Sequence, residues 1–420
     1  MVLHDALSED HVEELAQLLA LIRRGSAVTR SELVQSSGFG RTAIARRLDH
    51  LMALGLIAES EPLPSTGGRM PRGVYFRADA GRLLVAELGA TSIAAGICDL
   101  DCRVLSSREE AWDIAAGPES TLARLEALLS ELLRDHQAKV WGIGVGLPGP
   151  IEFATGRPVS PPIMPGWDRY PVRERLAKRF SAPVWVDNDV NVLALGELRA
   201  GVGRAHSDLI YIKIGTGIGA GIVSGGRLHR GAQGCAGDIG HVAVTDDQAV
   251  VCRCGNIGCL EAVAGGAALA RRATAWAREG RSGYLQQRLT EGGDLTAATI
   301  AAGAAAGDTG CVELLAAAAR QIGDSLATFV NFFNPSIVII GGGVAQAGNA
   351  FLASIRQRVY SRSLPLATRD LQIVLSSLGD IGGLIGAAHM VVDEILSPKV
   401  LSLWIKEGTP EALAGAHAGN

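Results

Sequence analysis

One histidine and three cysteines near the middle of the 420-residue chain have the types and spacing of a metal site. Ten residues separate His241 from a segment that contains Cys252, Cys254 and Cys259. One imidazole and three thiolates form a closed tetrahedral ligand set for Zn²⁺, and these ligands favour zinc over calcium or magnesium. The sequence therefore predicts a structural zinc site at these four residues.

Two carboxylates bracket this cluster. Asp238 lies three residues before His241, and Glu261 lies two residues after Cys259. A zinc clip of this kind would hold both acids rigidly at the edge of a pocket, where they could bind a ligand. The residues alone leave open a second interpretation, in which a structural zinc knuckle is flanked by two solvated acids.

A further acid follows an apolar segment, residues 183–188, that is typical of a buried strand. Open α/β sheets bind ligands at the carboxyl ends of their strands, and Asn188 and Asp189 stand at such an end. Asp189 could accept the proton of an attacking hydroxyl. The alternative is that this Asn-Asp pair only caps the next helix.

Three glycine-rich segments are candidates for nucleotide binding. Glycine lets backbone N–H groups approach a phosphate closely, so these segments could hold a nucleotide. Tight turns without a ligand are the alternative for each segment taken singly. The residues assigned to a nucleotide are Gly89, Thr91, Gly215, Thr216, Gly217, Gly341, Gly342 and Gly343.

The elements that must position these residues alternate between strands and helices, which indicates an α/β protein with mixed sheets covered by helices. Strands are expected within residues 83–97 (two, around a turn), 140–146, 183–188, 210–223 (a hairpin) and 337–341, the last running into a helix. Helices are expected over residues 119–136, 172–180 and 189–200.

The first eighty residues have a different pattern. Helices are expected from Ser8 to Gly25, over 30–36 and over 41–54, followed by two short strands around a loop at 62–73. This order predicts a winged helix-turn-helix. Residues 22–77 contain nine arginines and four acids, although the whole chain has a net charge of −4.

DNA is the partner that such a basic winged helix favours. On the third helix Thr42 and Arg46 would contact base edges, and Arg41 and Arg47 would contact phosphates. In the loop between the strands, Arg69 and Arg72 would reach a minor groove or the backbone. The alternative is a small helical protein-interaction module with a solvated basic face. The remaining chain divides into a domain at 81–397 and a tail at 398–420, of which 408–420 should fray.

Composition excludes some other classes. No apolar run reaches the roughly eighteen residues that a membrane span needs, and the first residues lack a secretory signal. Four cysteines outside the zinc cluster are scattered, which argues against a disulfide scaffold and for a cytoplasmic location. These four are Cys98, Cys102, Cys235 and Cys311.

Taken together, residues 9–397 resemble the ROK family of repressors, open reading frames and kinases, specifically its sugar-responsive transcriptional regulators. The resemblance rests on Ser65-Thr-Gly-Gly-Arg69, Gly144-Val-Gly-Leu-Pro-Gly-Pro150, Asp187-Asn-Asp189, Gly215-Thr-Gly-Ile-Gly-Ala-Gly221, Asp238-Ile-Gly-His241 and the segment from Cys252 to Glu261. It implies an actin-like, two-lobed sugar-kinase fold behind the winged helix-turn-helix. It also implies that sugar hydroxyls contact Asn188, Asp189, Asp238, His241 and Glu261. If the protein is an active kinase, the resemblance implies that Asp189 is the catalytic base and that ATP with Mg²⁺ is the cofactor.

Four positions depart from the pattern of the kinase members. Glu87 replaces an Asp that helps hold magnesium, Ser92 replaces a Lys, Asp238 replaces a Glu, and Ile163 replaces an Asn. A displacement near 1 Å at a reacting group can lower a rate by roughly a hundredfold. These departures weigh against phosphoryl transfer more than against sugar binding.

The sequence therefore predicts a sugar-responsive repressor that acts as a homodimer or homotetramer on operator DNA. The alternative is an ATP-dependent sugar kinase that retains a DNA-binding domain.

Overall fold

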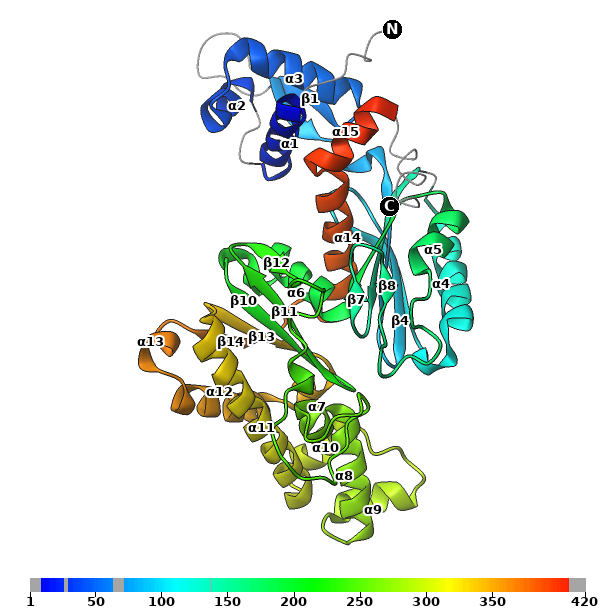
Figure 1. Cartoon of the computed structure of the whole chain (residues 1–420), viewed down its shortest axis with the longest axis vertical. Coiled ribbons are helices and arrows are strands. Elements are labelled where there is room, and N and C mark those ends of the chain that lie inside the picture. Colours follow the sequence, from blue (N-terminus) through cyan, green and yellow to red (C-terminus); the bar gives the residue numbers. More distant parts are fainter. Residues whose placement is uncertain (1–8, 26–28, 63–71, 137, 408–420) are drawn as a thin grey trace.

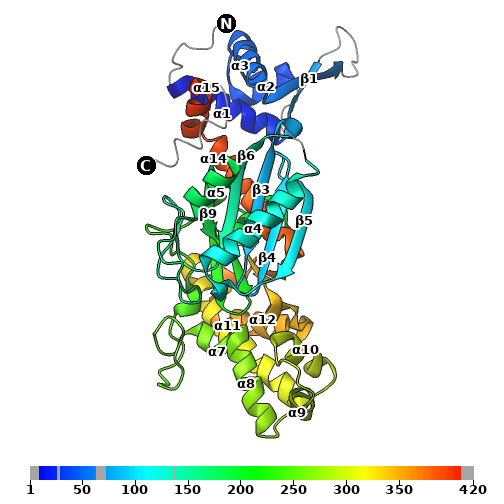
Figure 2. The same ribbon diagram turned by 90° about the vertical axis from the view of Figure 1, so that its right-hand side faces the viewer.

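A computed structural model describes residues 9–25, 29–62, 72–136 and 138–407. The molecule is elongated, with the N-terminal helices at one end and two lobes below them (Figures 1 and 2). The part before residue 78 is called the head. Residues 82–188 form most of lobe 1, and residues 209–375 form most of lobe 2.

The head contains three helices and a two-stranded antiparallel sheet, in the order that the sequence predicts. The apolar positions of the first helix are buried at helical spacing, among them Leu15, Leu19 and Ile22. Thr29 caps the second helix through a reciprocal capping box with Glu32. The elements are α1 (Glu9–Arg23), α2 (Arg30–Ser37), α3 (Arg41–Ala53), β1 (Ile57–Pro62) and β2 (Arg72–Phe76).

Lobe 1 is built on a five-stranded sheet with the order β5-β4-β3-β6-β9. Strands β3, β4 and β5 are antiparallel neighbours, whereas β6 and β9 run parallel to β3. The strands are β3 (Arg82–Leu88), β4 (Ser92–Cys98), β5 (Val104–Ala111), β6 (Val140–Leu147) and β9 (Val184–Asn188). Helices α4 (Pro118–Leu133) and α5 (Val172–Phe180) cover one face (Figure 2). A small hairpin of β7 (Ile151–Glu152) and β8 (Arg157–Pro158) follows β6.

Lobe 2 repeats this strand arrangement in the order β12-β11-β10-β13-β14. Its first three strands are again antiparallel neighbours, and the last two are parallel to β10. The strands are β10 (Leu209–Ile214), β11 (Ile218–Ser224), β12 (Arg227–His229), β13 (Ile337–Gly341) and β14 (Gln372–Leu375). The helices are α7 (Leu260–Ala264), α8 (Gly266–Arg278), α9 (Gly283–Thr290), α10 (Ala297–Ala305), α11 (Thr309–Phe333), α12 (Asn349–Arg362) and α13 (Pro365–Thr368). The α/β prediction is confirmed.

Two helices, α6 (Asp189–Arg199) and α14 (Gly382–Ile395), pack against each other between the two sheets. Their backbones approach closely, because a Cβ on Gly386 would collide with the carbonyl oxygen of Val192. A Cβ on Gly196 would likewise collide with the carbonyl oxygen of Gly382. Both lobes therefore rest on one tightly packed helix pair.

The segment from residue 398, expected as a tail, begins with a packed helix, α15 (Pro398–Glu407), which is a correction. It lies beside α1 in both ribbon views (Figures 1 and 2). Trp404 is buried and meets Trp141 of β6 edge-on, with ring centroids 4.8 Å apart. Leu401 is also buried, so apolar residues at helical spacing explain why this segment folds onto the body. The expected fraying at 408–420 lies outside the described residues.

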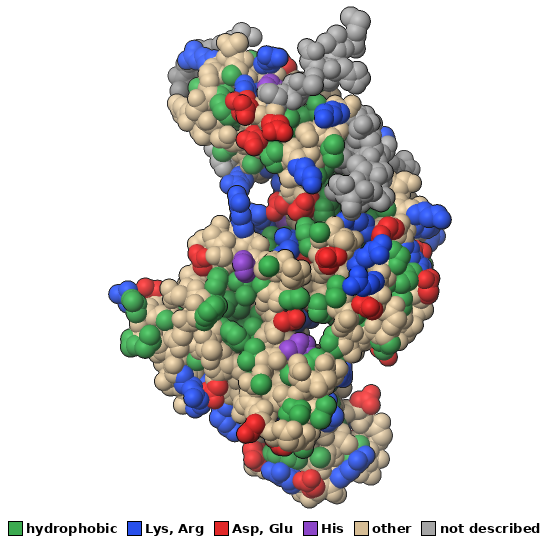
Figure 3. Space-filling model, viewed as in Figure 1, with side chains coloured by type: hydrophobic (Ala, Val, Ile, Leu, Met, Phe, Trp, Pro, Cys, Tyr) green, Lys and Arg blue, Asp and Glu red, His purple; other side chains and the backbone are tan. Residues whose placement is uncertain are grey.

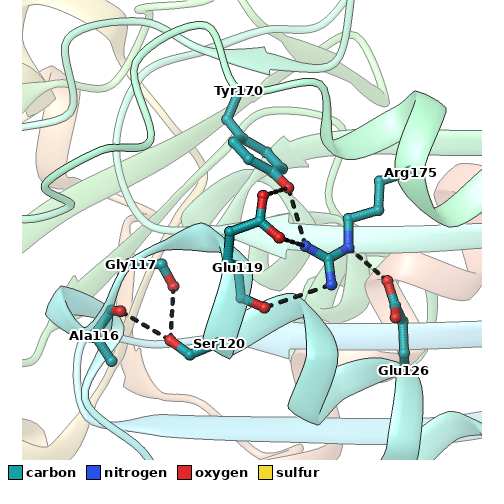
Figure 4. Close-up of polar contacts among 7 residues, drawn as sticks. All are labelled: Ala116, Gly117, Glu119, Ser120, Glu126, Tyr170 and Arg175. Atoms are coloured by element: carbon teal, nitrogen blue, oxygen red, sulfur yellow. Dashed lines mark hydrogen bonds and ion pairs between the residues drawn. The ribbon is translucent and has the colours of Figure 1, made fainter.

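Polar contacts fix the outer surface of lobe 1 (Figure 4). The Tyr170 hydroxyl donates to Glu119 at 2.6 Å, and Arg175 donates to the other oxygen of that carboxylate at 2.7 Å. Arg175 also donates to Glu126 at 2.6 Å, so α4 and α5 are held together. This network anchors the loop before α5, which includes Ile163. Among the helices that the structure describes, none is long and apolar enough to cross a membrane.

Candidate functional site

A cavity of about 870 Å³ lies where the two lobes meet, between their glycine-rich turns. It brings together all the residues that the sequence assigns to a sugar or a nucleotide. The sugar candidates on its wall are Asn188, Asp189, Asp238, His241 and Glu261. The nucleotide candidates on its wall are Gly89, Thr91, Gly215, Thr216, Gly217, Gly341, Gly342 and Gly343.

The His and Cys cluster forms one compact group at the edge of this cavity. The ligand atoms of His241, Cys252, Cys254 and Cys259 all lie within 4.8 Å of one another. The His241 Nδ1 to Cys252 Sγ distance is 3.6 Å, and the Cys254 to Cys259 Sγ distance is 3.8 Å. A tetrahedron with ordinary Zn–N and Zn–S bond lengths has edges of about 3.6 and 3.8 Å for these pairs. These two distances match the edges of a tetrahedral Zn²⁺ site, and the donor types suit Zn²⁺.

Local backbone contacts hold this cluster in shape. Isolated β-bridges join Ala243 to Cys259 and Val251 to Ile257. Between them, the Gly258 N–H donates to the carbonyl of Val250 at 2.8 Å. These contacts close residues 243–259 into a loop. Residues 238–261, which include this loop and the two acids, are called the zinc-type segment.

The two acids that bracket the cluster occupy different surroundings. Asp238 precedes the short 3₁₀ turn Ile239–His241, and burial raises the pKa of its carboxyl while His241 opposes that shift. Glu261 lies at the start of α7 and accepts a hydrogen bond from the N–H of Ile218 at 3.0 Å. A Cβ on Gly217 would collide with the Glu261 carboxylate. Glu261 therefore ties the zinc-type segment to the β10–β11 turn, and a side chain at 217 would displace its carboxylate.

Asn188 has the helix-capping role that the sequence left open. Its side-chain oxygen accepts from the N–H of Val190 at 2.9 Å, and its amide donates to the carbonyl of Gly149 at 2.5 Å. The preceding residue, Asp187, is buried and accepts from Arg230 of lobe 2 at 2.7 Å. The Asp187–Asp189 motif thus joins the lobes as well as lining the cavity.

Asp189 is paired with a cation that sequence reasoning missed. One of its carboxylate oxygens accepts from the N–H of Val190 at 2.8 Å, and the other accepts from Lys213 Nζ at 2.8 Å. Lys213 Nζ also donates to Glu87 at 3.0 Å. Burial alone would lower the pKa of Lys213, but the Asp189 and Glu87 carboxylates outweigh it and raise that pKa above its ordinary value. A lysine inside an otherwise apolar strand, two residues before a glycine turn, was the available signal.

The glycine turns also have structural reasons for their composition. A Cβ on Gly341 would collide with the Tyr211 hydroxyl. Gly342 has φ +89°, a left-handed conformation that favours glycine. The segment after it is a 3₁₀ turn, Gly343–Ala347, and α12 begins only at Asn349, which corrects the expected direct entry into a helix.

The side chains of α3 that the sequence assigns to DNA differ in their exposure to solvent. Arg41, Thr42 and Arg46 are exposed on α3. Arg47 is a correction, because it is buried, forms an ion pair with Glu14 and lies over the ring of Phe39 at 5.0 Å. It falls one turn from Ile44 and Leu51, on the apolar face of the helix.

On the hairpin, Arg72 is exposed and pairs with Glu59 of β1 at 3.3 Å. Arg69 lies outside the described residues. In Figure 3 the visible face of the head carries both basic and acidic side chains, so the positive excess of the head is not one continuous patch on that face.

The fold and the cavity define a two-lobed α/β protein of the sugar-kinase type with a winged-helix head. The sequence pattern of the ROK family matches residues 84–394, and the chain belongs to this family. The resemblance and the actin-like fold drawn from the sequence are confirmed.

Known relatives are of two kinds. The xylose repressor of Caldicellulosiruptor bescii is 30% identical over 394 residues, which cover 92% of this chain and 97% of that protein. A glucokinase of Halalkalibacterium halodurans is 35% identical over 268 residues, or 63% of this chain and 81% of the enzyme. A crystal structure of a ROK family transcriptional regulator, a homolog of the E. coli MLC protein, superposes with a TM-score of 0.81 at 26% identity. That superposition covers 95% of this chain and all of the other.

Proposed function

We propose that the protein is a transcriptional repressor whose binding to operator DNA responds to a sugar held in the cavity between the lobes. The observation that carries this proposal is the extent of similarity. Relatives that share nearly the whole chain, head included, are a repressor and a regulator, whereas the glucokinase alignment is shorter. The exposed Arg41, Thr42 and Arg46 on α3 support a DNA-reading role for the head.

Sugar is the ligand class that the cavity favours. Its wall offers hydrogen-bonding groups from both lobes, including Asp189 of α6 and Asp238, His241 and Glu261 of the zinc-type segment. Carboxylates and an imidazole at fixed positions suit a ring of hydroxyl groups. A ligand that contacts both lobes would stabilise one relative lobe position over others, which is the requirement for an allosteric effect.

Zn²⁺ is the metal that His241, Cys252, Cys254 and Cys259 would hold. With four protein ligands the site is closed, so the metal would supply structure and no chemistry at a substrate. It would fix the backbone that positions Asp238 and Glu261 at the cavity.

A route from the cavity to the head is built into the packing. Helix α6 begins at Asp189 and packs on α14, which leads to α15, and α15 packs on α1 of the head. The buried apolar side chains of the head are continuous with those of α14 and α15. A change at the cavity would therefore reach α1 through packed helices. We further propose a homodimer or homotetramer, because one winged helix buries little DNA surface.

The direct test is selection of bound fragments from a random DNA pool with the full-length, zinc-loaded protein, followed by footprinting with and without a panel of sugars. We expect a two-fold symmetric protected site that at least one sugar weakens. No protected site under any condition would overturn the proposal.

Arg46→Ala should lose the footprint while its melting temperature is unchanged. Light scattering of the free protein gives the oligomeric state.

A second candidate is an ATP-dependent sugar kinase that retains a DNA-binding domain. The glucokinase relative and the glycine turns on the cavity wall favour it. A coupled assay of ADP release over the same sugars distinguishes the two functions. Sugar-dependent turnover that Asp189→Asn abolishes would establish the kinase.

A further inference from the structure

Two oppositely charged side chains occupy corresponding positions of the two lobes. Glu87 is the second-last residue of β3, and Lys213 is the second-last residue of β10. Each strand is the centre of its sheet and leads into a glycine-containing turn. Each residue also pairs with a glycine of the parallel neighbour, Glu87 with Gly146 and Lys213 with Gly341.

The two side chains meet across the boundary between the lobes. Lys213 Nζ lies 3.0 Å from a Glu87 oxygen and 2.8 Å from an Asp189 oxygen. The three side chains are largely buried, with 23%, 14% and 10% of their surfaces exposed for Lys213, Glu87 and Asp189. A buried ion pair is stabilising only where hydrogen bonds satisfy each charged group. Here the single ammonium group of Lys213 donates hydrogen bonds to both carboxylates.

The surrounding backbone is shaped to admit this contact. A Cβ on Gly383, at the start of α14, would collide with the Glu87 carboxylate. Gly219 and Gly341 pair with Lys213 on the two adjacent strands.

We propose that Lys213 is the resident cation of the Glu87–Asp189 carboxylate pair and takes the place that a divalent cation would otherwise fill. Two carboxylates held together beside a cavity are ligands that Mg²⁺ and Mn²⁺ prefer. An ammonium already bonded to both repels a second cation from the same site. It also donates a hydrogen bond to Asp189 at 2.8 Å, so one oxygen of that carboxylate is already occupied.

This inference stands apart from the proposed function, because cation binding is measured without DNA or sugar. The probe is Mn²⁺, titrated into the full-length, zinc-loaded protein and followed by the electron paramagnetic resonance signal of free Mn²⁺. We expect Lys213→Met to gain one Mn²⁺ site at least about tenfold tighter than any in the unaltered protein. Lys213→Arg retains the cation and should show no gain. Zinc content must stay constant, so that exchange at the cysteines is excluded.

Two further variants make the test decisive. Lys213→Met combined with Asp189→Asn removes half of the carboxylate pair and should lose the new site. Lys213→Gln, which can still hydrogen-bond to both carboxylates, replaces Lys213→Met if the latter does not fold. Mn²⁺ should raise the melting temperature of the Met or Gln variant and leave that of the unaltered protein unchanged. Equal Mn²⁺ binding by folded variant and unaltered protein would overturn the proposal.

Discussion

The two lobes share one strand arrangement, yet they differ at the places where chemistry would occur. In lobe 1 the turn after the central strand follows an acid, Glu87, and in lobe 2 the equivalent turn follows a base, Lys213. Lobe 2 also contains the His and Cys cluster, which has no counterpart in the described part of lobe 1. The shared strand arrangement thus determines which positions of the two lobes lie close together. The side-chain types at those positions determine which chemistry can occur there.

The comparison of the lobes also distinguishes two kinds of glycine. Some are constrained by a neighbouring side chain, and others are free to accommodate a ligand. A Cβ on Gly217 would meet the Glu261 carboxylate, and a Cβ on Gly341 would meet the Tyr211 hydroxyl, irrespective of any nucleotide. The corresponding turn of lobe 1 has fewer such constraints, since a Cβ on Gly89 would come no closer than 3.3 Å to the Ser92 hydroxyl. A glycine-rich turn in this fold therefore does not by itself indicate a bound phosphate.

The largest expected effect concerns the cluster that only lobe 2 has. Cys254→Ser should reduce bound metal from about one zinc per chain to well below one, as measured by elemental analysis. Structural zinc sites supply on the order of 10 kcal/mol of binding free energy in small domains, so lobe 2 should melt first in this variant. Cys235→Ser, at an exposed cysteine outside the cluster, is the matched control. Unchanged zinc content in Cys254→Ser would contradict the assignment.

The next effect addresses the charge pair that joins the lobes. Lys213→Met leaves two largely buried carboxylates without their cation, which should lower the free energy of unfolding by about 3 to 5 kcal/mol. Denaturant titration measures this loss. Glu87→Gln leaves the Lys213–Asp189 pair intact and should cost less, about 1 to 2 kcal/mol. Equal losses for the two variants would argue against a central role of Lys213.

The third prediction concerns the pH dependence of stability where lobe 1 meets the head. There, His389 of α14 should make the free energy of unfolding depend on pH. Burial in α14 lowers the pKa of His389 from 6.5 to about 4, with Arg23 of α1 and Arg199 adding to the shift and Asp393 opposing it. The unfolded chain therefore takes up the proton first. The stability contributed by neutral His389 is fully present above about pH 6.5 and is lost as the pH falls toward 4.

At most about 3 kcal/mol should be lost in this window. Melting temperatures from pH 7 to 4 should fall less steeply for His389→Gln than for the unaltered protein. His229→Gln, at an exposed histidine of lobe 2, should leave the curve unchanged. Parallel curves for all three proteins would show that His389 makes no such contribution.

The smallest expected effect extends the comparison to two adjacent arginines of the head. Arg46→Ala should weaken binding to the selected DNA by roughly 5- to 150-fold, because a base contact contributes about 1 to 3 kcal/mol. Its stability should not change. Arg47→Ala should instead lower the free energy of unfolding by about 1 to 3 kcal/mol, since it removes the ion pair with Glu14. Fluorescence anisotropy and denaturant titration measure the two effects, and a reversed pattern would exclude α3 as the reading helix.

Local signals were enough for much of the architecture. The spacing of apolar residues predicted α1, α3 and α4, and strand composition with glycine turns predicted the β3–β4 and β10–β11 hairpins. These predictions succeeded because periodicity, capping and turn chemistry act over a few residues. The packed α15 was missed, although Leu401 and Trp404 have helical spacing, because a short apolar segment near a chain end does not reveal its partner.

For the site, the sequence by itself determined the ligand types: three thiolates and an imidazole for a metal, acids around them and glycine turns nearby. Only the tertiary structure decided which charges meet. Arg46 and Arg47 are neighbours with identical side chains, and helix phase turned one outward and one into the core. Lys213 and Glu87 are far apart in the chain, yet Lys213 Nζ lies 3.0 Å from a Glu87 carboxylate oxygen. The contact forms because the sheets of the two lobes meet at the ends of β3 and β10. Pairing of this kind depends on packing between lobes, so a local residue pattern can mark Lys213 as unusual but cannot identify its partners.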